Sequence, residues 1–543
     1  MKRPNQKTTH TNSANLNRFL PKKKTLLAGL LISAMAMGKA FCADNPDPVL
    51  DLLLQKGIIT DAEAAKVKAE LNEKRTNEMA QMPASKWMLG SGIKNIELFG
   101  DIRLRFEDRT VTDPGGGRIE LNRMRYALRF GARGDAFDDF YYGFRFDTAP
   151  NPRSPWVTFG TSASGTPYQG PFGKSQGGLF LGQIFLGWKP NEYVNITAGK
   201  MAQPLYTTPM VWDTDFNPEG LAEHFKYKVG GATFFANLGQ FLYEDTNPNK
   251  ASRGYFGVGN LYPSTLGGTA GPAFLLAWQG GFQYDFTKDI SFEIAPVLYT
   301  YTGHGANTSQ SSSMVQPGFS GTFSGQGATN GPAGVPSAGW SGFPSGYEDG
   351  FNANQTGINN LLVLEIPWEI DFKIAELNAR VFGDFADNLQ GKQRALAAQA
   401  AANSPPGPLQ IGGVAPIASA QTHDTKAYQV GFAIGNKNNL GLVYGAPTHR
   451  HAWEFRTYWQ HVEQYALDDN LIDSDFFEGR GNLEGVYAAV GYGLTDNVMT
   501  TFRYGHAHRI NKMLGTGGSN QDIPQMNPIE HYDILQLDLT MRF

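Results

Sequence analysis

Long stretches of the chain alternate between apolar and polar residues with a period of two. This period predicts β-strands with two chemically different faces, because successive side chains of a strand point to opposite sides. The stretches at 101–107, 123–133 and 140–147 show the pattern most clearly. In the second of these, Arg123, Arg125, Arg129 and Arg133 alternate with Met124, Tyr126, Leu128 and Phe130.

The apolar face of these predicted strands is rich in aromatic residues, as at Trp453, Phe455 and Trp459. A soluble β-sandwich would turn that face inward. A membrane barrel turns this face outward to lipid and lines a water-filled interior with polar groups. Its strands are about 10 residues long. The long strands and the aromatic content favour the barrel, and a soluble exported β-protein is the alternative that fractionation without detergent would reveal.

Turn signals divide residues 96–543 into alternating short and long connections, which is the connectivity of an outer-membrane barrel. Eight long connections predict eight hairpins, and therefore an all-β fold: a transmembrane antiparallel β-barrel of about sixteen strands. One connection, 435–450, should be short and is not. The short connections are expected at 134–138, 189–192, 228–232, 287–290, 371–374 and 495–497, and the long ones at 107–121, 148–178, 201–221, 244–271, 303–357, 388–423, 466–482 and 510–530.

The N-terminal region has the features of an exported protein. Lys22, Lys23 and Lys24 precede an apolar run at 26–37, followed by small residues. This arrangement predicts a secretory signal peptide over 1–43, since the run is shorter than the roughly 18 apolar residues of a membrane-spanning helix. Residues 44–95 are then expected to form a short periplasmic helical segment before the barrel at 96–543, because Thr60 and Glu63 have capping-box spacing.

Composition narrows the function. The chain of 543 residues has 46 basic and 50 acidic side chains, for a net charge of −4, so no nucleic-acid partner is expected. The single cysteine excludes an internal disulfide and a cysteine-rich metal site. The pairs His449/His451 and His506/His508 have a spacing that can bind a metal, but no acidic or cysteine residue lies close by in sequence. We therefore expect rim histidines and no bound metal or cofactor.

No catalytic constellation emerges from the sequence. The glycine- and serine-containing stretch at 160–165 lacks the strand and helix that flank a hydrolase nucleophile, and no glycine-rich loop ends in a phosphate-binding Lys-Ser/Thr pair. The protein is not expected to be an enzyme, with a barrel-type outer-membrane enzyme as the rival class.

The last predicted strand alternates up to the final residue, with apolar side chains at 535, 537, 539, 541 and 543. Outer-membrane barrels commonly finish on such a strand with a terminal phenylalanine, which the barrel-assembly machinery recognises. Phe543 is expected to be the residue that this machinery recognises.

Four stretches together carry a resemblance to the bacterial putative porin family of outer-membrane proteins. They are Leu-Leu-Leu-Gln-Lys-Gly-Ile-Ile-Thr at 52–60, Thr-Ala-Gly-Lys-Met at 197–201, Trp-Asp-Thr-Asp-Phe-Asn-Pro-Glu-Gly at 212–220 and Asp-Ser-Asp-Phe at 473–476. The resemblance implies a water-filled channel in the bacterial outer membrane, in contact with its lipid, that assembles as a homotrimer or another homo-oligomer. It implies passive diffusion of small hydrophilic solutes and ions, without cofactor.

The charged positions on the first three predicted strands point to electrostatic selection in a narrow lumen, where low-dielectric walls focus the field of fixed charges. The loop at 201–221 is expected to fold inward, with its carboxylates facing an arginine wall. Two alternatives stay open: local ion pairs and turn caps that do not shape the pore, and an anion- or substrate-selective channel that uses an arginine-lined lumen. The predicted wall consists of Arg103, Arg105, Arg123, Arg125, Arg129, Arg133 and Arg145 with Asp101, Glu107 and Asp147, and the loop acids are Asp213, Asp215 and Glu219.

Overall fold

The computed structural model describes residues 92–149, 151, 153–160, 178–244, 273–303, 360–402, 423–436, 440–517, 522–523, 526 and 528–543, together with Lys56. The chain divides into two units, residues 1–88 and 89–543. The predicted signal peptide at 1–43 and nearly all of the predicted helical segment at 44–95 lie outside the described residues. Among the described residues, none of the helices combines the length and the apolar character needed to cross a membrane.

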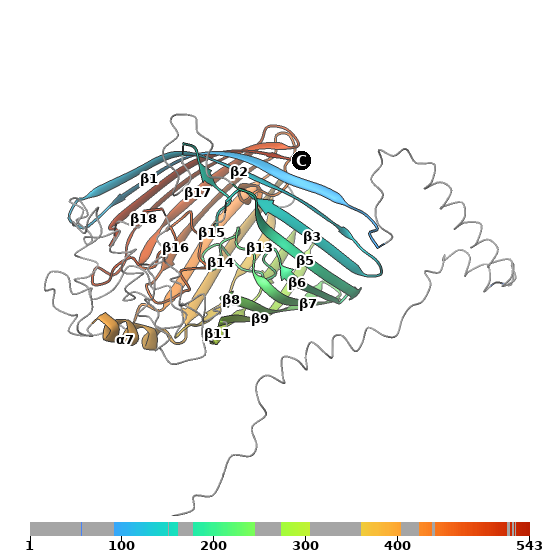
Figure 1. The fold of residues 1–543 in the computed structure, drawn as a ribbon, viewed down its shortest axis with the longest axis horizontal. Coiled ribbons are helices and arrows are strands. Elements are labelled where there is room, and N and C mark those ends of the chain that lie inside the picture. The colour runs from blue at the N-terminus through green and yellow to red at the C-terminus, as the bar shows by residue number, and fades with distance from the viewer. Residues whose placement is uncertain are drawn as a thin grey trace, which may run out of the picture. The chain divides into compact units, whose positions relative to one another are not determined.

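Antiparallel strands pair with their neighbours in sequence order into one sheet, and β1 also pairs with β19, so the sheet closes into a barrel (Figure 1). The strands are β1 (Glu97–Thr112), β2 (Arg118–Asp135), β3 (Phe140–Asp147), β4 (Val157–Thr158), β5 (Phe180–Asn191), β6 (Val194–Lys200), β7 (Glu219–Val229), β8 (Ala232–Glu244), β9 (Ala273–Thr287), β10 (Ile290–Ile294), β11 (Val297–Gly303), β12 (Leu362–Glu365), β13 (Trp368–Ile374), β14 (Leu377–Asn388), β15 (Lys426–Gly435), β16 (Trp453–Val462), β17 (Leu483–Gly493), β18 (Val498–Arg509) and β19 (His531–Arg542).

Two of the spanning strands are interrupted by proline, which has no N–H to donate to a neighbouring strand. Pro296 separates β10 from β11, and Pro367 separates β12 from β13. Both halves of each broken strand continue along the same neighbours, and β4 is a two-residue addition to β2. The barrel therefore has sixteen spanning strands, which confirms the predicted number and the all-β class.

Short turns and long connections alternate around the barrel. All short turns but one lie at one end, the short-turn end, and all long connections but one lie at the other, the long-loop end. The expectation of a long connection at 107–121 was wrong. The strands β1 and β2 continue beyond the apolar belt with polar outward residues, and only residues 113–117 connect them. Asp113 closes this turn by accepting hydrogen bonds from the backbone N–H groups of Gly115 and Gly117, both at 2.8 Å. The connection between β14 and β15, expected as a loop, also contains the helix α7 (Gly391–Ala402).

The apolar face of the strands points outward and the polar face points into the barrel. On β1, Ile102 and Leu104 are 41% and 45% exposed, whereas Arg105 and Glu107 on the opposite face are 4% and 0% exposed. The C-terminal strand repeats this arrangement, with Leu537 exposed. Apolar outward and polar inward is the arrangement of a transmembrane barrel, because lipid surrounds the outside.

The one long connection at the short-turn end folds back into the barrel. Between β15 and β16, residues 440–452 include a single turn of 3-10 helix, η6 (Leu442–Tyr444), whose Leu442 and Val443 are almost completely buried. Glu454, which points inward from β16, accepts hydrogen bonds from the backbone N–H groups of Gly441 and Leu442 at 2.6 and 2.5 Å. These contacts hold the segment against the inner wall.

Candidate functional site in the barrel interior

Two loops from opposite walls meet in the middle of the barrel. One is 201–218, between β6 and β7, and the other is 463–482, between β16 and β17, half of the sixteen strands away. The N–H of Asp213 donates to the carbonyl of Leu471 at 2.6 Å, and the N–H of Asp473 donates to the carbonyl of Pro209 at 3.1 Å. Together the loops form a bridge across the lumen, which we call the loop bridge.

The loop at 201–218 is also fixed to the wall beyond it. Thr207 donates to Glu365 of β12 at 2.7 Å, and the N–H of Tyr206 bonds to Gln279 of β9 at 2.9 Å. Trp212, which is 2% exposed, packs its ring against Phe241 and Tyr299 with both centroids 6.1 Å away. A loop with a buried aromatic anchor and side-chain hydrogen bonds is a rigid part of the interior.

Glu107 is the centre of an arginine cluster on the inner wall, close to the long-loop end. Its carboxylate accepts hydrogen bonds from Arg109 at 3.0 and 3.2 Å and from Arg123 at 2.7 Å, and also from Gln536 at 2.8 Å. The guanidinium groups of Arg105 and Arg125 each lie 3.7 Å from it. Asp522 also contacts Arg109 and Arg123, so Glu107 and its acidic neighbours together compensate these buried cations, which is the condition under which buried charges are tolerated.

Arg105 connects this cluster to the loop bridge. Its guanidinium binds Asp538 of β19 at 2.7 and 2.9 Å and Asp475 of the loop 463–482 at 3.0 and 3.1 Å. It also lies over the ring of Trp156 at 4.2 Å, a cation–π contact.

The predicted wall and loop residues come together only in part. Asp215 of the inward loop accepts a hydrogen bond from Arg129 at 3.0 Å, so one loop carboxylate does face the arginine wall. Asp213 instead accepts hydrogen bonds from the hydroxyl and N–H of Ser474, at 2.9 and 3.0 Å. Glu219 pairs with Lys200 at 2.5 Å, away from the arginines.

The arginines of the first three strands all have carboxylate neighbours. The contacts are Arg103 with Asp101 at 2.7 Å, Arg105 with Asp538 at 2.7 Å, Arg123 with Asp522 at 2.8 Å, Arg125 with Glu107 at 3.7 Å, Arg129 with Asp101 at 2.9 Å, Arg133 with Glu97 at 2.7 Å and Arg145 with Asp147 at 2.7 Å. This pairing reduces the net positive charge that the wall presents to the lumen. The effect of these residues on conduction stays a prediction.

The acids of the loop bridge are shifted toward their neutral forms. Burial raises the pKa of Asp473 to about 7, and repulsion from Asp475 adds to the effect. Burial, followed by the negative charges of Asp473 and Asp215, raises the pKa of Asp213 well above its usual range. Near neutral pH the bridge therefore carries less negative charge than its six aspartates suggest.

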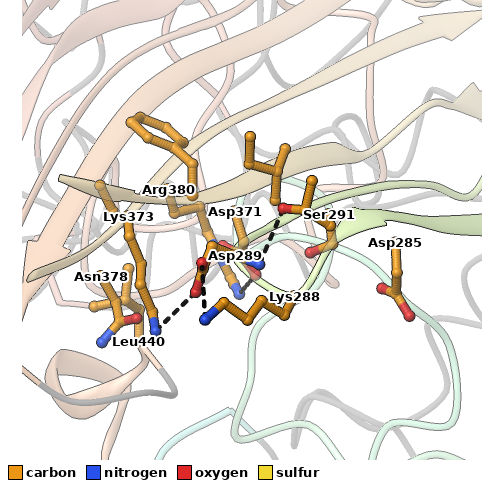
Figure 2. Close-up of a pocket in the computed structure, with 13 residues that line it drawn as sticks. Asp285, Lys288, Asp289, Ser291, Asp371, Lys373, Asn378, Arg380 and Leu440 are labelled. Atoms are coloured by element: carbon orange, nitrogen blue, oxygen red, sulfur yellow. Dashed lines mark hydrogen bonds and ion pairs between the residues drawn. The ribbon is translucent and has the colours of Figure 1, made fainter. Parts of the chain in front are cut away.

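Two cavities border the inward segment 440–452. A cavity of about 200 Å³ lies between the loop bridge, the arginine wall and Val443, Tyr444 and Gly445. A second cavity, of about 560 Å³, lies at the short-turn end and is lined by Leu440 and by residues of β10, β13 and β14 (Figure 2). The segment thus contributes to the walls of both.

The larger cavity is lined by charges that pair with one another. Figure 2 shows Lys373 and Lys288 directed at Asp289, with nitrogen–oxygen distances of 2.9 and 4.0 Å, and Arg380 bound to Asp371 at 2.6 Å. Such a cavity is polar and nearly balanced in charge, which suits water and hydrated ions.

The histidine pairs lie away from the lumen cavities. His506 and His508 point outward from β18 and contact Asp533 at 2.8 Å and Glu484 at 3.0 Å. His451 contacts the hydroxyl of Tyr492 at 2.7 Å at the short-turn end. In the part of the chain that the structure describes, no group of three or more His, Cys, Asp or Glu side chains is arranged to hold a metal ion.

Several interior residues escaped the sequence analysis as site candidates: Arg109, Arg503, Arg542, Asp475 and Tyr444. Arg542 and Arg109 could have been found, because they share the inward parity of the alternating strands on which they lie. Tyr444 could not have been found from periodicity, since it lies in the connection at 435–450, which is longer than the alternation of connections requires and has no strand pattern.

A closed sixteen-stranded barrel with an apolar exterior, a charged interior and long connections at one end defines an outer-membrane β-barrel of the channel-forming class. The sequence profile described as putative porin matches residues 116–543. The chain belongs to this family and is an outer-membrane porin of bacteria, which places the short-turn end at the periplasm and the long-loop end outside the cell.

Other comparisons give distant similarity. No curated protein matches the chain. The chain is similar to the high-pH structure of Pseudomonas putida OprB, with 12% identity, a TM-score of 0.42, and coverage of 83% of this chain and 94% of the other. It is also similar to in-vitro folded OmpT, an outer membrane protein of Vibrio cholerae, with 9% identity, a TM-score of 0.36, and coverage of 85% and 100%.

Proposed function

We propose that this porin is a passive channel for small hydrophilic solutes and ions, and that its constriction lies between the loop bridge and the arginine wall. The observation that carries the proposal is the contact of Asp215 with Arg129 at 3.0 Å, which brings opposite charges together inside a barrel with a polar lining. Fixed charges in a narrow aqueous passage with low-dielectric walls act strongly on passing ions.

The selectivity of the channel depends on whether these charges cancel. If they cancel, the channel is a general diffusion pore with weak ion preference. A second candidate function, an anion-selective channel, is favoured by the lining of the 200 Å³ cavity, which contains five arginines and four aspartates.

Planar-bilayer recordings of the refolded protein test the proposal. Discrete conductance steps are expected, with a reversal potential in a KCl gradient that shifts toward cations in Arg129→Gln and toward anions in Asp215→Asn. Arg118→Gln is the matched control, because Arg118 is 58% exposed at the tip of the β1–β2 hairpin. Absence of conductance steps overturns the channel, and unchanged reversal potentials in both variants overturn the assignment of the constriction.

A further inference from the structure

Among the residues that the structure describes, one arginine of the small lumen cavity has no ion-pair partner. Five arginines line this cavity: Arg103, Arg105, Arg129, Arg503 and Arg542. The first four each have a carboxylate oxygen within 4.0 Å, whereas Arg542 has none among the described residues. Its Nε is buried and has no hydrogen-bond partner in the described part of the chain. Its side chain lines the cavity, so the part of the guanidinium that faces the cavity is suited to receive an acceptor from a solute.

Gly445 packs directly against the guanidinium of Arg542. Its φ of +85° is in the left-handed region, and a Cβ at this position would lie 2.8 Å from Nη2 of Arg542. Glycine alone lets the inward segment come this close without filling the space beside the charged group.

Aromatic rings line the same cavity. Tyr444 is 42% exposed, and the guanidinium of Arg456 lies 4.8 Å from the centre of its ring. The rings of Tyr458 and Tyr487 stack with their centroids 4.9 Å apart and also line the cavity. The cavity therefore combines one unpaired cation with flat apolar surface.

The carboxylates of the cavity are already engaged. Asp215, Asp475 and Asp538 bind arginines, and Asp473 accepts hydrogen bonds from the backbone N–H groups of Asp475 and Phe476, both at 3.1 Å. The lining has five arginines and four aspartates, and Arg542 is the arginine with no carboxylate oxygen within 4.0 Å among the described residues.

From these contacts we infer that the cavity is a binding site for small aromatic monocarboxylates of the size of benzoate. The carboxylate binds the guanidinium of Arg542, and the ring lies beside Tyr444. A volume of about 200 Å³ is below the ~300–1,000 Å³ of sites for drug-sized ligands, so the solute has a single ring. The inference deepens the proposed channel function by assigning a preferred solute class to it.

Isothermal titration calorimetry of the detergent-solubilised barrel at low ionic strength tests the site without any need for conduction. Benzoate is expected to bind. Benzamide, which has the ring without the charge, and acetate, which has the charge without the ring, are each expected to bind at least about tenfold more weakly, because each loses one half of the contact. Equal affinity for all three, or no binding of benzoate, overturns the inference.

Variants identify the residues. Arg542→Gln is expected to lower the affinity for benzoate at least about tenfold, since a charge-assisted pair is lost. Arg542→Lys keeps the charge without the planar guanidinium, so its affinity for benzoate should lie between those of the unchanged protein and Arg542→Gln. Tyr444→Leu is expected to reduce the preference for benzoate over acetate. Arg118→Gln is the matched control, because it removes the same charge from an exposed ion pair outside the cavity. A change in the control as large as in Arg542→Gln contradicts the site.

A further variant covers the case in which substitution in β19 prevents folding. Gly445→Ala lies outside the strands and places a methyl group against the guanidinium, so it is expected to weaken benzoate while the barrel still folds, as judged by heat-modifiable migration. Unchanged affinity in folded Gly445→Ala overturns the inference. Benzoate binding without conductance would refute the proposed channel function but support the binding site. Conductance without benzoate binding would refute the binding site but support the channel.

Discussion

Glu107→Gln removes the carboxylate at the centre of the arginine cluster while preserving its shape. Glu107 is fully buried and contacts Arg109 and Arg123 directly, with Arg105 and Arg125 at 3.7 Å. Removing one partner from a buried ion pair costs about 3–5 kcal/mol, because the remaining charge is left uncompensated.

The contacts that survive the substitution place the expected loss at the lower end of this range. Asp522 stays in contact with Arg109 at 3.1 Å and with Arg123 at 2.8 Å. Glutamine also retains one acceptor oxygen for a guanidinium. We therefore expect the free energy of unfolding to fall by about 3 kcal/mol.

Urea unfolding of the barrel in lipid, followed by tryptophan fluorescence, measures this change. Glu120→Gln is the control, because Glu120 pairs with Arg118 on the exposed hairpin tip, where an ion pair contributes about 0–1 kcal/mol. In bilayers the same substitution should shift the reversal potential toward anions, since it adds one net positive charge to the lumen. If Glu107→Gln is no less stable than Glu120→Gln, the arginines do not depend on this carboxylate and the reasoning fails.

Three further predictions address other parts of the molecule. Leu104→Arg puts a charge on the outward face and should cost about 2–4 kcal/mol if the residue lies near the bilayer midplane, measured as a lower yield of folded barrel in lipid vesicles. Trp212→Ala removes the buried anchor of the loop at 201–218, with an expected cost of about 3–5 kcal/mol to the packing of that loop, and should raise single-channel conductance. The pKa of Asp473 is raised to about 7, so the folded protein holds a proton that the unfolded chain releases near 3.8. The free energy of unfolding should therefore fall as pH rises from about 4 to about 7 and then level off. Asp473→Asn should flatten this profile in urea titrations.

Each of these has an outcome that contradicts it. Normal insertion of Leu104→Arg would mean that the residue does not face lipid, and Thr110→Arg, which lies outward above the apolar belt, is its control. Conductance that is unchanged in Trp212→Ala would show that the loop does not narrow the passage. A pH profile that is the same with and without Asp473 would assign the titration to another group.

The sequence alone determined the barrel, because the period of the strands and the choice of which face is apolar are both local properties of the chain. Alternation along β2 and β19 sets which residues face lipid, and the spacing of turn signals sets the number of hairpins. The end of β1 was misjudged for the same reason: beyond Phe106 its outward residues are polar, so the apolar signal stops while backbone pairing continues to Thr112.

The tertiary structure alone decided what occupies the interior. The meeting of Asp213 with Ser474, and of Arg105 with Asp475, joins residues more than 250 positions apart, and no periodicity encodes such a contact. The inward course of the segment containing Tyr444 likewise depends on Glu454 and the space left by the surrounding strands. Local pattern fixes the wall of this porin, whereas its interior is occupied by loops whose positions arise only when the closed barrel brings distant side chains together.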